Sequence, residues 1–385
     1  MANIYFDHNA TTALDSRVLE AMLPWMQTQT GNPTSRHVAG RAARDAIEYA
    51  RTQVAEACGA YSAQVTFTAS GTESNNFAVK GMAQHVENGQ ILTSAIEHPC
   101  VTKPALSMRN LGHQHQVINV DNHGNIDVAQ YKALLNTPTS LVSVMFANNE
   151  TGVIQDIAQL AEIARQARAL VHTDAVQGVC KIPLSFTDLN VHAMTVSSHK
   201  IGGPQGAAAL ILDKRVDIQP LLHGGGQERG LRSGTENVAS IVGFGMACEI
   251  GMANLANYTQ HTSHLRDAFE QGLKALATQF NLMIFGQAVA RLPNTSFFAI
   301  EDIEGETLVM ALDRKGFGVA SGSACSSDST EPSHVLLAMG IHPDLARGAV
   351  RVSFGNTNSM AEVEHFLTVL RDEVLRLKQL TAIAA

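Results

Sequence analysis

Short apolar runs alternate with stretches of helical spacing between about residue 65 and residue 212. The apolar runs fall at residues 65–67, 91–94, 115–120, 141–145, 170–173, 194–197 and 207–212. Apolar positions recur at helical spacing between some of them, over residues 74–86, 127–135 and 157–169. This alternation predicts a mainly parallel, seven-stranded sheet covered by helices, so the region is expected to have an α/β fold.

The pattern changes after residue 212. A Gly-rich segment at residues 223–226 precedes a long helical stretch at 237–280, and a domain boundary is expected inside that stretch. Beyond it we expect strands at 295–300, 318–321 and 350–353 and helices at 304–315, 333–339 and 360–380. Because these do not follow strict strand–helix order, they predict a smaller C-terminal α+β domain.

Composition and charge narrow the class of protein. The chain has 385 residues, of which 45% are hydrophobic and 16% charged, a balance that indicates a folded protein with sizeable cores. Its formal net charge of −8 argues against nucleic acid as a partner and favours a small substrate. We expect no membrane association, because no apolar run approaches the roughly 20 residues of a membrane span.

The N-terminal residues and the spacing of the cysteines indicate a cytoplasmic protein. The first seven residues lack the basic and apolar regions of a secretory signal. Five cysteines at irregular spacing fit neither a disulfide framework nor a zinc site, so we expect free thiols. Cys58, Cys180 and Cys248 have apolar contexts and are expected in the core, whereas Cys325 lies in a small, polar stretch typical of a surface loop.

Two polar segments follow predicted strands. The segment from Ser70 to Asn76 opens a helix, whose N-terminal N–H groups suit a phosphate, although a simple helix cap has the same pattern. Asp174 follows another strand, at the sheet edge where ligands bind in α/β proteins. Its carboxylate could pair with a protonated ring nitrogen, or it could cap a helix.

Lys200 is the third candidate, and it is the most specific. It lies directly after an apolar strand and before a Gly-rich turn, in the run Ser197-Ser198-His199-Lys200. A lysine held among cationic or apolar groups can form a Schiff base, while the ordinary alternative is a surface lysine in a loop. A phosphate-binding turn, an aspartate for a ring nitrogen and a Schiff-base lysine together indicate a pyridoxal phosphate enzyme.

The chain resembles the cysteine desulfurases of the NifS/IscS type, among the class V aminotransferases of fold type I. The resemblance runs from the N-terminal segment to the final helix, and its motifs are Gly31-Asn32-Pro33, Glu97-His98-Pro99, Asn148-Asn149-Glu150-Thr151-Gly152, His172-Thr173-Asp174-Ala175-Val176-Gln177, Ser198-His199-Lys200, Arg232-Ser233-Gly234-Thr235 and Ser321-Gly322-Ser323-Ala324-Cys325. It implies a large cofactor-binding domain of residues 15–258. Residues 1–14 and 259–385 would form a small domain that carries the catalytic cysteine loop.

The resemblance also implies the role of each site residue. Lys200 would hold pyridoxal phosphate covalently, Asp174 would pair with its ring nitrogen, and His98 would stack on the ring. The remaining contacts would be Gln177 with the ring oxygen, Asn149 with ring and substrate, Arg351 with the substrate carboxylate, Gly71, Thr72, Ser197 and His199 with the phosphate, and Thr235 with the phosphate of a second subunit of a homodimer.

The implied activity converts L-cysteine to L-alanine. The Cys325 thiolate would take the sulfur as a persulfide for a sulfur-acceptor protein such as an iron–sulfur scaffold, and His98 is the candidate proton acceptor for the thiol. The alternatives are another aminotransferase or lyase of the fold, such as a selenocysteine lyase, or an inert subunit that only binds an acceptor. Cys325 has no duty in transamination, and the presence of both Lys200 and Cys325 argues against an inert subunit.

Two positions depart from the family pattern. Cys100 stands near the predicted site where a small apolar residue is expected, and Asn356 stands where many relatives have arginine. The segment from Gly234 to Val238 and the short C-terminus are nearer the nitrogen-fixation type than the housekeeping type. Which acceptor receives the sulfur is left open by these features.

Overall fold

The computed structural model describes residues 4–322 and 331–384. Its largest element is a seven-stranded sheet in the order β2-β8-β7-β6-β5-β3-β4. The strands are β2 (Val65–Thr68), β3 (Gln90–Ser94), β4 (Gln114–Ile118), β5 (Thr139–Ser143), β6 (Leu170–Asp174), β7 (Ala193–Ser197) and β8 (Ala208–Leu212). All seven strands predicted between residues 65 and 212 are therefore present, within a few residues of the predicted bounds.

Six of these strands run in one direction. Only β8 is antiparallel to its neighbours β7 and β2, and β2 therefore points the same way as β7. The carboxyl ends of β2, β3, β5, β6 and β7 consequently open at one edge of the sheet, which is where α/β proteins bind their ligands.

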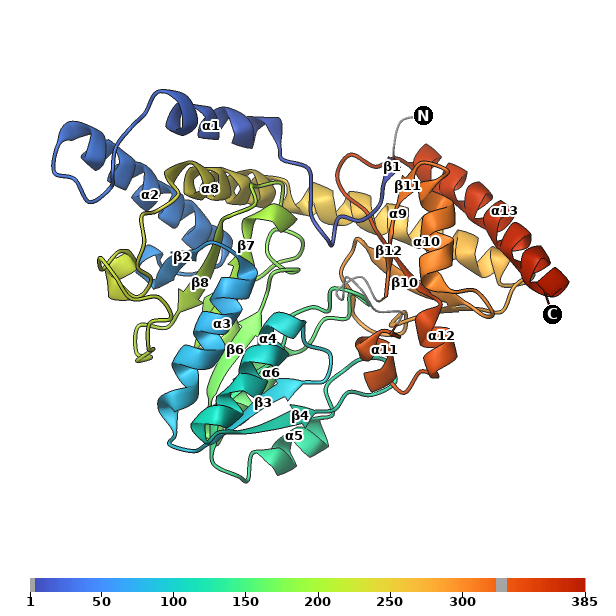
Figure 1. Cartoon of the computed structure of the whole chain (residues 1–385), viewed down its shortest axis with the longest axis horizontal. Coiled ribbons are helices and arrows are strands. Elements are labelled where there is room, and N and C mark those ends of the chain that lie inside the picture. Colours follow the sequence, from blue (N-terminus) through green and yellow to red (C-terminus); the bar gives the residue numbers. More distant parts are fainter. Residues whose placement is uncertain (1–3, 323–330, 385) are drawn as a thin grey trace.

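Helices bury both faces of the sheet (Figure 1). In β8, Ala209 and Ile211 belong to the cluster that contains α2 and α8, while Leu210 and Leu212 belong to the cluster that contains α3. Successive side chains point to opposite faces, so an all-apolar strand with a core on each side is the expected result. The helices of this part are α1 (Ser16–Gln27), α2 (Val38–Ala57), α3 (Gly71–Met82), α4 (Pro99–Ser107), α5 (Val128–Leu134), α6 (Ile157–Gln166), α7 (Phe186–Leu189) and α8 (Val238–Ala253).

The C-terminal part contains a smaller antiparallel sheet in the order β12-β13-β10-β9. Its strands are β9 (Leu282–Ile284), β10 (Thr295–Ile300), β12 (Ala320–Ser321) and β13 (Ala349–Ser353), and the flanking helices are α9 (Leu255–Leu276), α10 (Gly305–Asp313), α11 (His334–Ala338), α12 (Pro343–Arg347) and α13 (Met360–Ala384). Short 3-10 turns occur at Ser62–Gln64, Ala83–His85, Met108–Leu111, Ser198–Lys200 and Glu228–Gly230.

The N-terminal segment joins the C-terminal part before it reaches the large sheet. Strand β1 (Ile4–Tyr5) pairs in parallel with β11 (Phe317–Gly318), and Phe6 is fully buried against Phe317, Phe354 and Phe366. Of the next residues, Asp7, Asn9 and Ala10 lie at the open edge of the large sheet, because they line a cavity there together with residues of its strands. The segment thus ties the two parts together at the site.

Two expectations need correction. The helical stretch predicted at 237–280 consists of α8 and α9, which meet at Asn254 at an angle of 72°. The strand predicted at 318–321 is split between β11 and β12, because Gly318 pairs with the N-terminal strand and Ala320 with β13. The implied boundary between residues 258 and 259 falls within α9 and stays a prediction.

No single helix among the described residues is long and apolar enough to cross a membrane. In the part of the chain that the structure describes, only α8 and α9 taken together reach that length and composition, across their bend.

Candidate active site

A cavity of about 460 Å³ opens at the carboxyl edge of the large sheet. We call it the edge cavity. Ten of the twelve predicted site residues line it, namely Gly71, Thr72, His98, Asn149, Asp174, Gln177, Ser197, His199, Lys200 and Arg351. Thr235 is exposed and lies outside this cavity, and Cys325 falls outside the residues that the structure describes.

The N-terminus of α3 forms one wall of the edge cavity. Ser70 caps the helix by accepting a hydrogen bond from the Glu73 N–H at 3.1 Å. Gly71 follows where a Cβ would lie 3.3 Å from Val176, so a larger residue would crowd the loop after β6. Ser197 lies nearby with a buried hydroxyl oxygen that has no hydrogen-bond partner in the described structure. Helix N–H groups and an unused hydroxyl suit an anionic group such as a phosphate.

Asp174 ends β6 and is almost fully buried. One carboxylate oxygen accepts from the Val176 N–H at 3.0 Å, and the other accepts from Asn75 Nδ2 at 2.7 Å. These neutral donors fix the carboxylate without neutralising it, which leaves its charge available to a cationic ligand atom. Asn75 comes from α3 and was not predicted from the sequence.

The Lys200 ammonium is held by the N-terminal segment. Its Nζ donates to the backbone carbonyls of Asn9 at 2.5 Å and Ala10 at 2.6 Å. His199 supports the same segment, because its Nδ1 lies 3.1 Å from Thr11 Oγ1 and its carbonyl accepts from Thr12. Burial, with the positive charge of Lys200, lowers the pKa of His199 to about 4.

Lys181 is a second lysine behind the edge cavity, and it is fully buried. Its Nζ donates to Gln177 Oε1 at 2.7 Å and to Asn9 Oδ1 at 3.2 Å, while Gln177 Nε2 donates to the Asn9 carbonyl at 2.9 Å. Burial holds the pKa of Lys181 well below its ordinary value, and Lys200 and Arg351 add to the effect. Lys181 therefore fixes which way the Gln177 amide faces.

Arg351 on β13 brings the C-terminal part to the edge cavity. Its guanidinium donates to Asp7 Oδ1 at 2.6 Å and to the Asn149 carbonyl at 3.0 Å, while its buried Nε has no partner in the described structure. A guanidinium with a spare N–H group can bind a carboxylate. Asp7, which orients it, is another residue that the sequence interpretation missed.

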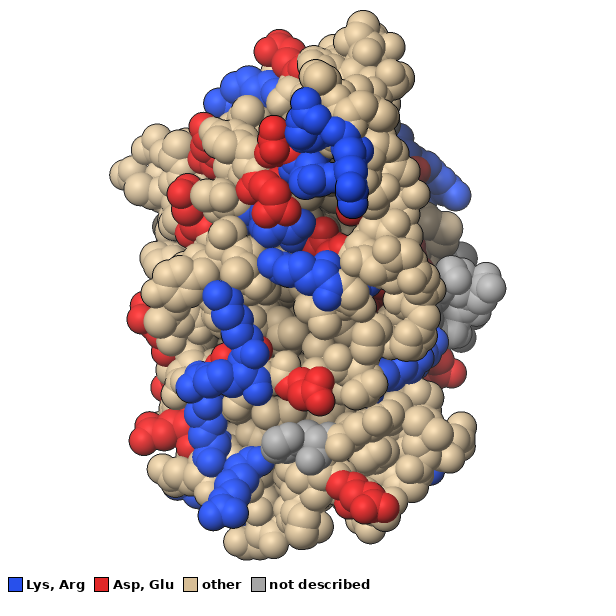
Figure 2. Space-filling model, turned by 90° about the vertical axis from the view of Figure 1, so that its left-hand side faces the viewer, with Lys and Arg blue, Asp and Glu red and all other residues tan. Residues whose placement is uncertain are grey.

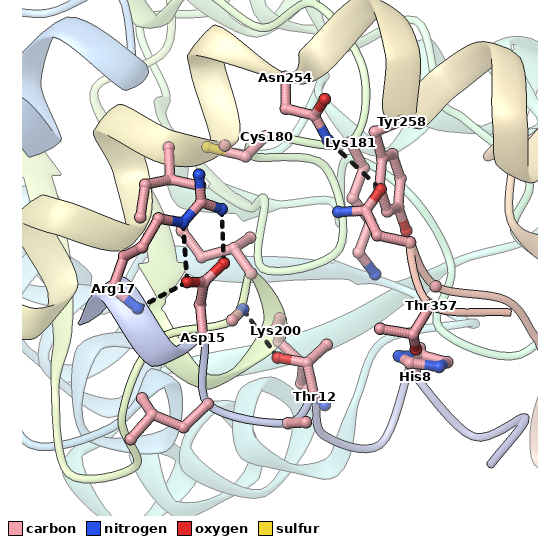
Figure 3. A pocket seen from close by; sticks show the side chains of 18 of the residues that line it. His8, Thr12, Asp15, Arg17, Cys180, Lys181, Lys200, Asn254, Tyr258 and Thr357 are labelled. Carbon is pink, nitrogen blue, oxygen red and sulfur yellow. Dashed lines mark hydrogen bonds and ion pairs between the residues drawn. The ribbon is translucent and has the colours of Figure 1, made fainter. Parts of the chain in front are cut away.

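A neighbouring cavity of about 420 Å³ borders Lys200 and Lys181 as well (Figure 3). Arg17 and Asp15 form an ion pair at 2.7 Å along its wall, and Tyr258 of α9 lines it with His8. Among the predicted site residues that the structure describes, only Lys200 lines it, whereas ten of them line the edge cavity.

The missed residues had weak sequence signals. Asn75, Lys181 and Asp7 are each close in sequence to a predicted residue or motif, because Asn75 follows Thr72 by three positions and Lys181 follows Gln177 by four. Their partners, however, come from other elements, so spacing alone could not reveal the contacts.

The sequence of this chain matches a known protein family. A model of the family described as Aminotransferase class-V matches residues 4–366. A cysteine desulfurase IscS of Dictyoglomus turgidum is 40% identical over 380 residues, which are 98% of this chain and 96% of that protein.

Solved structures of NifS-like proteins are also similar to this chain. A NifS-like protein from Rickettsia africae superposes with a TM-score of 0.87 at 37% identity, covering 96% of this chain and 99% of its own. A second NifS-like protein reaches a TM-score of 0.90 at 37% identity, covering 97% of this chain and 100% of its own. The chain is thus similar to these proteins over nearly its whole length.

Proposed function

Because this chain belongs to the aminotransferase class-V family and is a pyridoxal-phosphate-dependent cysteine desulfurase, we propose that it passes the sulfur of L-cysteine through a persulfide on Cys325 to an acceptor protein of iron–sulfur cluster assembly. The observation that carries the assignment of the site is the edge cavity, where the predicted lysine, aspartate, histidine and arginine converge.

The residues of the edge cavity fit pyridoxal phosphate. The α3 N-terminus and the unpartnered Ser197 hydroxyl would hold its phosphate, Asp174 would pair with its ring nitrogen, and Lys200 would attach it. When bound, this group supplies a sink for the electrons of the substrate's Cα–H bond. Substrate binding, proton transfer and sulfur transfer would depend on side chains of this chain.

Arg351 and Lys200 would handle the substrate. The guanidinium of Arg351, held by Asp7, would bind the L-cysteine carboxylate, and the Lys200 amine, once released, would take the Cα proton. The two carbonyls that now bind the Lys200 ammonium would keep its nitrogen close to the site.

Sulfur transfer would then use Cys325. Its thiolate attacks the substrate sulfur, so an S–S bond forms as the Cβ–S bond breaks. The substrate carbon skeleton takes up a proton in place of sulfur and leaves as L-alanine. L-Cysteine and a thiol thus give L-alanine and a persulfide, and no external oxidant is needed.

The variant Cys325→Ser tests the persulfide, with Cys100→Ala as the control for the other thiol at the site. Cys325→Ser is expected to keep the cofactor and its absorption spectrum but to lose alanine formation and protein-bound sulfur, measured by mass spectrometry. Loss of turnover in Cys100→Ala with retention in Cys325→Ser would refute the proposal.

A homodimer is the second part of the proposal. Thr235 is exposed and does not line the edge cavity of its own subunit. Helices α1 and α2 lie on the left-hand side of the molecule in Figure 1. Figure 2 shows this side with Lys and Arg beside Asp and Glu over its upper half and a run of Lys and Arg lower down. A surface with both signs of charge can face a copy of itself, because a two-fold interface brings each patch onto another part of the same surface.

Mixing Lys200→Ala with Thr235→Ala protein tests the shared site. Activity of the mixture above that of either parent is expected if Thr235 acts on the partner's cofactor. A strictly monomeric and active enzyme in sedimentation experiments would contradict the dimer.

For the cellular compartment we propose the reducing cytoplasm, supported by free thiols at Cys58, Cys100, Cys180 and Cys248.

A further inference from the structure

Cys100 makes contacts that neither the family assignment nor the proposed sulfur transfer uses. It lines the edge cavity at the start of α4, two residues after His98. Its Sγ lies 2.9 Å from His98 Nδ1, and its backbone N–H donates to the same Nδ1 at 3.2 Å. Two groups of one residue thus meet one ring nitrogen.

The backbone contact decides which nitrogen of the neutral ring carries the proton. A backbone N–H is always a donor and cannot rotate away, so Nδ1 must present its lone pair. The proton of neutral His98 is then on Nε2, and the Cys100 thiol, which can rotate, donates S–H to Nδ1 as well. No described residue offers Nε2 a hydrogen-bond partner, so the Nε2–H is free to donate to a ligand.

The Cys100 sulfur also connects His98 with Asp174. Asn75 Nδ2 has two hydrogens, and its neighbours are Cys100 Sγ at 3.0 Å and Asp174 Oδ2 at 2.7 Å. Asn75 Nδ2 donates one hydrogen to each of these two atoms. A continuous chain of hydrogen bonds therefore runs from Asp174 through Asn75 and Cys100 to His98. All four residues line the edge cavity.

We propose that Cys100 is a positioning residue, which holds His98 as an Nε2–H donor toward the ligand and links it through Asn75 to Asp174. In this arrangement His98 cannot accept a proton on Nε2, and acceptance on Nδ1 would break two hydrogen bonds. The thiol proton of Cys325 therefore needs another acceptor, which differs from the role suggested for His98 by the sequence.

Titration of His98 depends on the groups that face it from several elements. Burial lowers the pKa of His98, Asp174 raises it, and Lys200, His334 and Lys103 lower it. Glu97, the preceding residue, has a pKa raised to about 8 by burial. The Cys100 thiol is itself protonated near neutral pH, because burial and the nearby Asp174 raise its pKa to about 12. A thiol in that state can donate S–H to Nδ1.

Nitrogen NMR of the histidine side chains in the full-length holoenzyme tests the proposal, with His98→Gln assigning the signal. We expect Nδ1 of wild-type His98 to have the shift of an unprotonated nitrogen and Nε2 that of a protonated one. Cys100→Ser, whose hydroxyl also donates, should keep this pattern. Cys100→Ala should let water reach Nδ1, so that His98 protonates at higher pH than in wild type.

Kinetics give a second readout. Cys100→Ala should lower kcat by about fivefold, as expected for one net hydrogen bond, with KM little changed, and Cys100→Ser should restore most of the loss. A wild-type His98 protonated on Nδ1 would overturn the proposal. So would identical histidine titrations in wild type, Cys100→Ala and Cys100→Ser. If Cys100→Ala failed to fold, the wild-type and Cys100→Ser spectra would still decide.

Discussion

Breaking the ion pair between Arg51 and Glu228 should destabilise the fold far more than breaking an exposed pair. Arg51 lies on α2 and Glu228 in the segment that leads to Thr235, and their side chains are only 5% and 2% exposed. The guanidinium and carboxylate form two hydrogen bonds, at 2.7 and 2.8 Å. The carboxylate also accepts from the Phe67 N–H at 2.8 Å, so it has three donors.

Glu228→Gln keeps the shape of the side chain but removes its charge. The amide would turn an N–H group toward either Arg51 or the Phe67 N–H, and the guanidinium would remain buried without a matching carboxylate. Breaking a buried pair in this way costs about 3–5 kcal/mol. We expect about 3 kcal/mol, because Glu48 still contacts Arg51 Nε at 3.1 Å.

Glu48→Gln is the matched control. Its carboxylate pairs with the same guanidinium, but its side chain is 58% exposed, so its removal should cost at most about 1 kcal/mol. Urea denaturation of both variants and the wild type, without cofactor and at one protein concentration, measures the two values. Equal losses in Glu228→Gln and Glu48→Gln would refute the reasoning that burial decides the strength of this pair.

Three further predictions concern the edge cavity and its support. Asp174→Ala should reduce turnover by several orders of magnitude with a smaller loss of cofactor affinity, since the phosphate contacts remain; near-normal turnover would contradict this. Ser70→Ala removes the cap of α3 and should lower the unfolding free energy by about 1 kcal/mol, whereas no change in urea denaturation would show that the cap is unimportant. Burial raises the pKa of Glu97 from 4.5 to about 8, so its proton stabilises the fold fully below pH 4.5, and this stability is lost as pH rises toward 8. Glu97→Gln should flatten that decline in urea denaturation, and an unchanged decline would contradict the assignment to Glu97.

The large sheet could be predicted from the sequence because its strands are short apolar runs separated by helical spacing. In β8 every residue from Ala208 to Leu212 is buried, which is the pattern of a strand with a core on each face. The helices α1 and α2 were not predicted. Helix α2 does bury apolar residues at helical spacing, namely Ala43, Ile47, Ala50, Val54 and Ala57, but three of these five are alanine, so the apolar signal in the sequence is weak.

The candidate site could be predicted where one strand or helix end determines a residue's position. Asp174 ends β6 and Lys200 comes shortly after β7, a parallel neighbour in the same sheet, so their convergence at one edge follows from parallel topology. The contacts of Lys181 with Asn9 and of Arg351 with Asp7 join residues more than 150 positions apart. Such contacts depend on how the N-terminal segment crosses the sheet edge, which no local pattern encodes.

The 72° bend at Asn254 was unpredictable for a related reason. The helical spacing of α8 and α9 is nearly continuous, and α8 is apolar around most of its circumference. A pattern of this kind predicts helix but carries no signal of direction. The bend depends instead on the two separate cores, because α8 packs on the large sheet and α9 on the small one.

The central claim is that the edge cavity and Cys325 convert L-cysteine into L-alanine and enzyme-bound sulfur. The most direct measurement incubates the purified holoenzyme with less than one equivalent of L-cysteine per active site and no keto acid, then quantifies alanine and persulfide in a single turnover. The account predicts one alanine for each persulfide, with the added sulfur located on Cys325 by peptide mass spectrometry. Alanine formed only when a keto acid is supplied, or sulfur located on Cys100, would contradict it.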